Sequence, residues 1–131
     1  MKLKISLLWL FLAVGFILHH IYGLFGVYYH ESLMMEGATG EVPLIHHIYR
    51  ILFEGIALIF CLLSLEITAK LYKWVAFVWA ILLGGYNVYH LVASFMYEAS
   101  NISEILILGW MVAVSALLIL NGYKWIKNGQ E

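Results

Sequence analysis

Long apolar segments alternate with short polar links along the whole chain. A helix needs about 20 mainly apolar residues to cross the roughly 30 Å hydrocarbon core of a bilayer. Short links make consecutive helices antiparallel neighbours, and a helix satisfies its own backbone amides, as hydrocarbon demands. The pattern therefore predicts an all-α integral membrane protein, a single domain of residues 1–131 built as an antiparallel bundle of four transmembrane helices. The predicted spans cover residues 5–29, 42–65, 74–97 and 105–123.

The composition agrees with a membrane location and excludes several classes of protein. Hydrophobic residues make up 64% of the chain and charged residues 11%, whereas soluble domains contain about 45–50% and about 25%. The net charge is −1 and no basic patch is present, so we expect no nucleic-acid partner. Cys61 is the only cysteine, which excludes an intrachain disulfide and CxxC motifs. The nucleophile, P-loop and dinucleotide-binding motifs of soluble enzymes do not occur.

Charge is sorted between the two sides of the predicted bundle. All six lysines fall on one side, and the links on the other side carry glutamates and no lysine. Because cytoplasmic segments are enriched in lysine and arginine, we expect both termini in the cytoplasm, in a bacterial or archaeal plasma membrane. The lysines are Lys2, Lys4, Lys70, Lys73, Lys124 and Lys127, and the opposing glutamates are Glu31, Glu36, Glu41, Glu98 and Glu104.

Five of the six histidines lie inside predicted spans, at similar depth. The tetrapeptide HHIY occurs twice, with His19 and His20 in the first span and His46 and His47 in the second, and the third span contains His90. At a rise of about 1.5 Å per residue, all five come out roughly 6–8 Å below the outer edge of the hydrocarbon core. The sequence therefore predicts one layer of imidazoles that three helices contribute.

Helical spacing indicates which imidazoles point into the bundle. Side chains three, four or seven positions apart share a helix face, which favours His19, His47 and His90 as the inward members. An alignment of GFILHHIYGLF with GYNVYHLVASF instead pairs His20 with His90, so the choice between His19 and His20 stays open. The first span also holds a stripe of small residues where a helix or a flat cofactor can approach the backbone: Gly15, Gly23 and Gly26.

The second span also contains two formal charges, Arg50 and Glu54, four residues apart. Charges inside a membrane span are costly, commonly paired and usually functional. We expect either an ion pair that fixes helix packing or a role in the site, and the sequence does not separate the two.

A b-type haem is the first cofactor that the imidazole layer suggests. Two helices of a four-helix bundle can each supply an axial imidazole, here His90 with either His19 or His20. His47 is a further candidate, and Arg50 is the cation that could neutralise a propionate. In architecture alone, such a bundle resembles the small four-helix membrane cytochromes b. The resemblance implies electron transfer or redox or gas sensing, with a membrane redox partner or a quinone.

Two other interpretations stay open. Imidazoles also bind copper or zinc without a haem. The chain could instead be a non-catalytic accessory subunit of a larger membrane complex, or a homo-oligomer, with Gly84 and Gly85 as a close-packing surface for a partner helix. The candidate ligands for a copper or zinc ion are His19, His20, His46, His47 and His90.

The haem hypothesis predicts a visible spectrum. Purified protein that binds haem should show a sharp Soret band that shifts when dithionite reduces the iron. His90→Ala should abolish the band because it removes an axial ligand. His30→Ala, in the link after the first span, should leave the band unchanged. Absence of the band after haem-replete expression, or an equal effect of both substitutions, would contradict the hypothesis.

Overall fold

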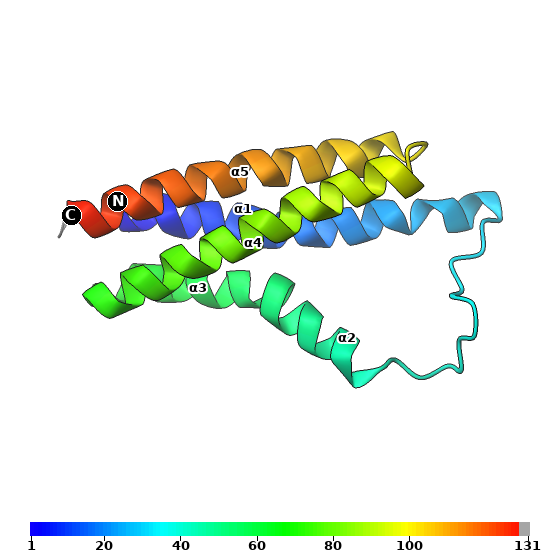
Figure 1. The fold of residues 1–131 in the computed structure, drawn as a ribbon, viewed down its shortest axis with the longest axis horizontal. Coiled ribbons are helices and arrows are strands. Elements are labelled where there is room, and N and C mark those ends of the chain that lie inside the picture. The colour runs from blue at the N-terminus through cyan, green and yellow to red at the C-terminus, as the bar shows by residue number, and fades with distance from the viewer. Residues whose placement is uncertain (129–131) are drawn as a thin grey trace.

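The computed structural model describes residues 1–128, and every helix or strand assigned in that part of the chain is a helix (Figure 1). Four helical stretches are long and apolar enough to cross a membrane, which confirms the predicted number of spans. Insertion into a membrane and the orientation of the termini stay predictions. The elements are α1 (Lys2–Gly23), the 3₁₀ segment η1 (Phe25–Tyr29), α2 (Leu44–Tyr49), the π-helical segment η2 (Arg50–Gly55), α3 (Ile56–Glu66), α4 (Lys70–Tyr97) and α5 (Ile102–Lys127).

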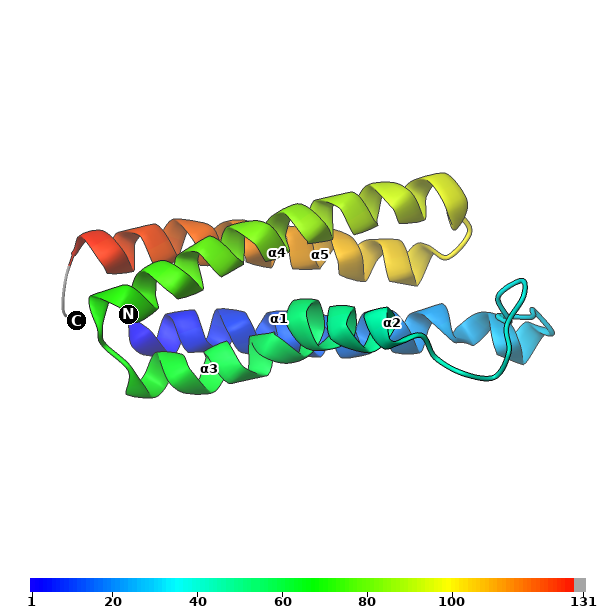
Figure 2. The same cartoon turned by 60° about the horizontal axis from the view of Figure 1, so that its bottom comes forward.

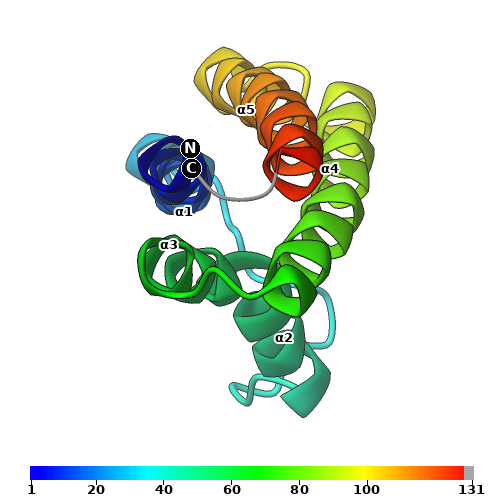
Figure 3. The ribbon, with the colours of Figure 1, turned by 90° about the vertical axis from the view of Figure 1, so that its left-hand side faces the viewer.

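The long helices lie side by side with alternating direction (Figure 2). α5 packs against both α4 and α1, and α1 also packs against α3 (Figure 3). The start of α1, the link between α3 and α4 and the end of α5 lie together (Figure 1). All six lysines therefore gather at one end of the bundle, which we call the lysine end. The opposite end, the acidic end, carries the loop after η1 and the link between α4 and α5.

Two glycines allow helices to pack closely inside the chain. A Cβ added at Gly15 of α1 would lie 2.7 Å from Cγ of Met111 on α5. One added at Gly84 of α4 would lie 3.1 Å from Cδ1 of Ile119, also on α5. Small residues allow this approach between apolar helices. Met111 therefore occupies the space at Gly15, where we expected that a helix or a flat cofactor could approach the backbone. Gly84 packs against α5 of the same chain instead of against a partner helix.

The exterior of the bundle carries many large apolar side chains. Large aliphatic side chains on all four spans are more than half exposed, including Ile17, Leu62, Val92 and Leu106. Large exposed apolar surfaces are rare on soluble monomers. The surface therefore favours a lipid surrounding for the four helices.

The second span is not the straight helix that the sequence predicts. It begins as α2, passes through η2 and continues as α3, and α2 bends away from the bundle (Figures 1 and 3). Backbone hydrogen bonds in a π-helix reach five residues instead of four, which disturbs the helical ladder and bends the axis. The indole Nε1 of Trp79 on α4 donates to the carbonyl of Leu52 (3.2 Å), and Phe53 stacks on Tyr86. α4 thus holds η2 in place, whereas no residue of α2 is buried.

We expect Trp79→Phe to destabilise the protein by about 0.5–1.5 kcal/mol, the net value of one hydrogen bond. Phenylalanine keeps a six-membered aromatic ring and loses the N–H that reaches Leu52, and the loss of the second ring of the indole is common to this variant and its control. Thermal unfolding in detergent measures the effect. Trp110→Phe is the matched control, because Trp110 is 60% exposed on α5. Equal losses from the two substitutions would show that the bond to Leu52 contributes nothing.

Candidate functional site

Two histidine–carboxylate contacts lie on different sides of α1, near the acidic end of the bundle. Nδ1 of His19 lies 3.1 Å from Oε1 of Glu104 on α5. His20, about 100° further around α1, places Nε2 2.9 Å from Oε2 of Glu54 in η2. The first contact is buried, since His19 is 5% exposed and Glu104 3%. The ring of His20 is half exposed. The adjacent histidines of the first HHIY thus face different helices.

The His19–Glu104 contact leaves a buried polar atom incompletely satisfied. Nδ1 of His19 has no aligned hydrogen bond, although the carboxylate oxygen is close. An unmatched polar atom in an apolar interior costs free energy, which a hydrogen-bonding group placed beside it recovers. The contact is therefore a place where a polar ligand would be stabilised.

Asn101 positions Glu104 and fixes the start of α5. Its Oδ1 accepts a hydrogen bond from the backbone N–H of Glu104 (3.3 Å), as expected of a helix N-cap. Its Nδ2 donates to Oε2 of Glu104 (2.7 Å) and to the carbonyl of Tyr22 on α1 (3.2 Å). The sequence NISE has the residue types and spacing of a capping box. That signal could have placed Glu104 in the first turn of α5, whereas sequence reasoning left it in the link before the fourth span.

His90 of α4 completes a group of three imidazoles. Its ring meets that of His19 edge to face, with centroids 4.5 Å apart and planes at 84°. The His19 and His20 rings are 5.1 Å apart. Tyr86 packs against the other side of His90, with centroids 5.6 Å apart. The structure therefore brings together His19, His20 and His90.

The second span does not add its histidines to this group. His46 and His47 lie on α2, and within residues 1–128 their side chains make no hydrogen bond, ion pair or ring contact. The prediction of a layer from three helices assumed a straight second span, and η2 turns α2 away from the bundle (Figure 3). The predicted ion pair between Arg50 and Glu54 is also not present among the described residues, because Glu54 faces α1 and contacts His20. Arg50 is exposed and lines a crevice of about 270 Å³ with these two residues.

A cavity of about 430 Å³ opens beside the cluster at the acidic end. It falls in the range of about 300–1,000 Å³ typical of small-molecule sites. Leu24, Leu33 and Tyr97 supply apolar and aromatic surface. The titratable groups in its wall are His19, His20, His90, Glu31, Glu98 and Glu104.

The observed arrangement favours neither of the predicted cofactors, haem b or a copper or zinc ion. Among the described residues, no three His, Cys, Asp or Glu side chains are placed so that they could hold a metal ion, so copper and zinc find no support. Two axial imidazoles lie on opposite faces of a haem, with the iron between them. The His19 and His90 rings are in direct contact, and a porphyrin cannot lie between them unless the rings separate. Haem b stays a prediction that the visible spectrum tests.

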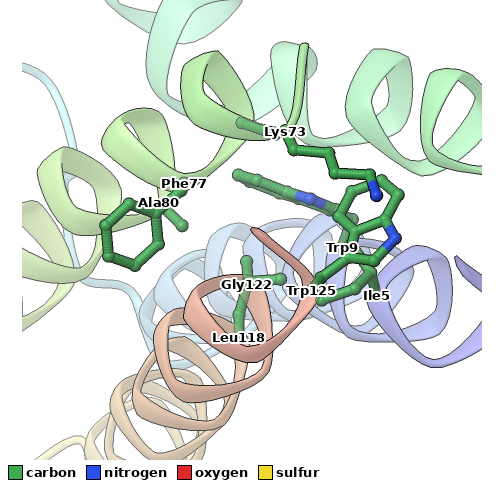
Figure 4. Close-up of a pocket in the computed structure, with 9 residues that line it drawn as sticks. Ile5, Trp9, Lys73, Phe77, Ala80, Leu118, Gly122 and Trp125 are labelled. Carbon is green, nitrogen blue, oxygen red and sulfur yellow. The ribbon is translucent and has the colours of Figure 1, made fainter. Parts of the chain in front are cut away.

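A second polar cluster lies at the lysine end and has no room for a ligand. Lys73 is 5% exposed and lies over the ring of Trp125, 5.0 Å from its centroid, with Trp9 beside them (Figure 4). The cavity among these side chains measures about 10 Å³, which is about the space of one water molecule. Sequence reasoning placed Lys73 in a link and missed its burial. We assign this cluster to packing between the ends of the helices.

We expect Asn101→Ala to lower stability by about 0.5–2 kcal/mol, the usual cost of losing an N-cap. Asn101→Asp should not restore it, although aspartate caps helices equally well. The aspartate lacks the N–H that reaches Tyr22 and adds a negative charge beside Glu104. Thermal unfolding in detergent measures both variants, with the exposed Asn128 as control in Asn128→Ala. Full recovery in Asn101→Asp would show that Asn101 acts only as a cap.

Comparisons with known proteins add no relative from which a role could be transferred. No protein-family model matches the chain, and neither a curated protein nor a solved structure is similar to it. The fold class is a four-helix apolar bundle, a class that serves many unrelated functions. The function must therefore be argued from the cavity and the side chains that line it.

Proposed function

We propose that this chain is a membrane protein that binds a small polar ligand in the cavity at the acidic end of its helix bundle. The buried contact between His19 and Glu104 in the cavity wall carries the proposal. Ionisable side chains within membrane spans are rare and mark ligand or ion pathways more often than packing sites. The predicted orientation puts this cavity on the outer side, so the ligand would come from outside the cell.

A structural role for the contact alone explains less of the arrangement. Asn101 already joins α5 to α1 through the carbonyl of Tyr22, so the buried pair is not needed to tie these helices. The pair also borders a cavity of about 430 Å³ that is open at the acidic end, so it lies where a ligand from the aqueous phase could reach it.

The cavity suits recognition of a ligand that enters from the aqueous phase at the acidic end. Loop residues, among them Glu31 and Ser100, form part of its lining, so the ligand need not cross the apolar core. Its wall offers carboxylate acceptors and imidazoles, which donate or accept according to tautomer. At the lysine end, the cavity beside Trp9 holds only about 10 Å³. We therefore propose binding or sensing at one end, in preference to transport through the bundle.

Cysteine labelling tests whether the cavity is open to water. In a Cys61→Ser background, Gly23→Cys should react with a membrane-impermeant maleimide in intact cells, because Gly23 lines the cavity and a Cβ there meets only ordinary contacts. Gly85→Cys is the matched control. A Cβ at Gly85 meets nothing within 4 Å on an exposed face of α4, which would lie in lipid.

Equal protection of the two cysteines, in intact cells and in inverted vesicles, would overturn the proposal. Labelling of Gly23→Cys in inverted vesicles alone would keep the cavity and reverse the predicted orientation.

A further inference from the structure

The charge of the cavity wall is one-sided. Three carboxyl groups line it, from Glu31, Glu98 and Glu104, and its lining contains no lysine or arginine. All six lysines lie at the far end of the bundle, and Arg50 lines a different crevice. A cavity lined by one sign of charge concentrates ligands of the opposite sign. The wall thus favours a cation.

Two of the carboxyl groups, those of Glu98 and Glu104, come from opposite ends of the short link between α4 and α5 and line the same cavity, and Glu104 is buried. Adjacent carboxylates repel each other unless positive charge or a proton lies between them. Nδ2 of Asn101 is a neutral donor to Oε2 of Glu104, and the imidazole of His19 lies 3.1 Å from Oε1. A bound cation would add positive charge at this point of the wall.

A separate observation comes from His19. Its ring lines the same cavity, and its buried Nδ1 has no aligned hydrogen bond. The imidazole donates or accepts according to its tautomer, and Oε1 of Glu104 lies 3.1 Å from this Nδ1. An alkylammonium carries three N–H donors, so one such group can serve more than one acceptor of the cavity wall.

The shape of the site favours an organic cation over a metal ion. The polar groups are spread around about 430 Å³, whereas metal ligands gather within about 2–2.6 Å of one point. Leu24, Leu33 and Tyr97 add surface for a carbon skeleton. The face of a tyrosine ring also attracts cations.

We infer that the ligand of this cavity is a small protonated amine, held by Glu98 and Glu104 with its carbon chain against Tyr97 and Leu33. The inference rests on the proposed ligand-binding function and names the chemical class of the ligand. The amine enters without any covalent change, by exchange with water at the acidic end.

Three four-carbon probes of different charge test the charge preference: n-butylammonium, n-butanol and butyrate. Isothermal titration of the purified protein should show binding of n-butylammonium, and the other two should bind at least tenfold more weakly. Glu104→Gln and Glu98→Gln should each weaken n-butylammonium binding at least tenfold. Glu36→Gln, in the loop outside the cavity, is the matched control. Butanol or butyrate binding as tightly as the amine would overturn the inference.

A cavity-filling variant tests, without a change of charge, whether n-butylammonium binds in this cavity. Gly23→Leu should abolish n-butylammonium binding because its side chain would occupy the cavity, while Gly85→Leu should leave binding unchanged. Binding that survives Gly23→Leu would place the amine elsewhere and overturn the inference. If Gly23→Cys is labelled from the acidic end and no probe binds, the amine is the wrong class and the cavity proposal stands. If Gly23→Cys is also protected, both fail.

Discussion

The cost of an unpaired polar group in an apolar surrounding constrains this bundle more than any other interaction. Outside and inside are both apolar, so each polar side chain must find a partner within the chain or in water at an end. Asn87 donates to Ser115 across the buried α4–α5 contact. His20 reaches Glu54, and the indole of Trp79 reaches a backbone carbonyl. Among the described residues, the matching is incomplete at three buried atoms, Nε1 of Trp9, Oδ1 of Asn87 and Nδ1 of His19. Of these, His19 lines the cavity of about 430 Å³ at the acidic end, and that coincidence is the basis for assigning the cavity a ligand.

The spans were predictable because each is a long apolar run bounded by charges. Sequence reasoning could not find the π-helical segment, because a straight α-helix satisfies the same pattern of apolar residues. The bend depends on contacts between residues distant in sequence, Trp79 with Leu52 and Phe53 with Tyr86. The depth estimate for His46 and His47 inherited the assumption of a straight helix, so it assigned them to a cluster that they do not join.

Depth along the helices did identify three side chains that the fold brings together, His19, His20 and His90. The depth estimate missed Glu104, because a carboxylate between two predicted spans is expected to be a solvated loop residue. The N-cap at Asn101 places Glu104 in the first turn of α5, where its Oε1 lies 3.1 Å from Nδ1 of His19. The difference matters chemically. Imidazoles alone suggest ligands for a metal or a haem, while imidazoles next to carboxylates suggest a site for a polar cation.

The π-helical segment directly follows the second HHIY and sets how that copy is oriented relative to α3. Geometrically, one π-helical turn is an α-helix that accommodates a surplus residue. That residue places α2 and α3 about 100° out of phase. Removal of a single residue between positions 50 and 55 would return the two halves to one register and turn the second HHIY toward another side of the bundle. The surroundings of the second HHIY thus depend on the number of residues between α2 and α3, and a change in chain length can alter them where no substitution occurs.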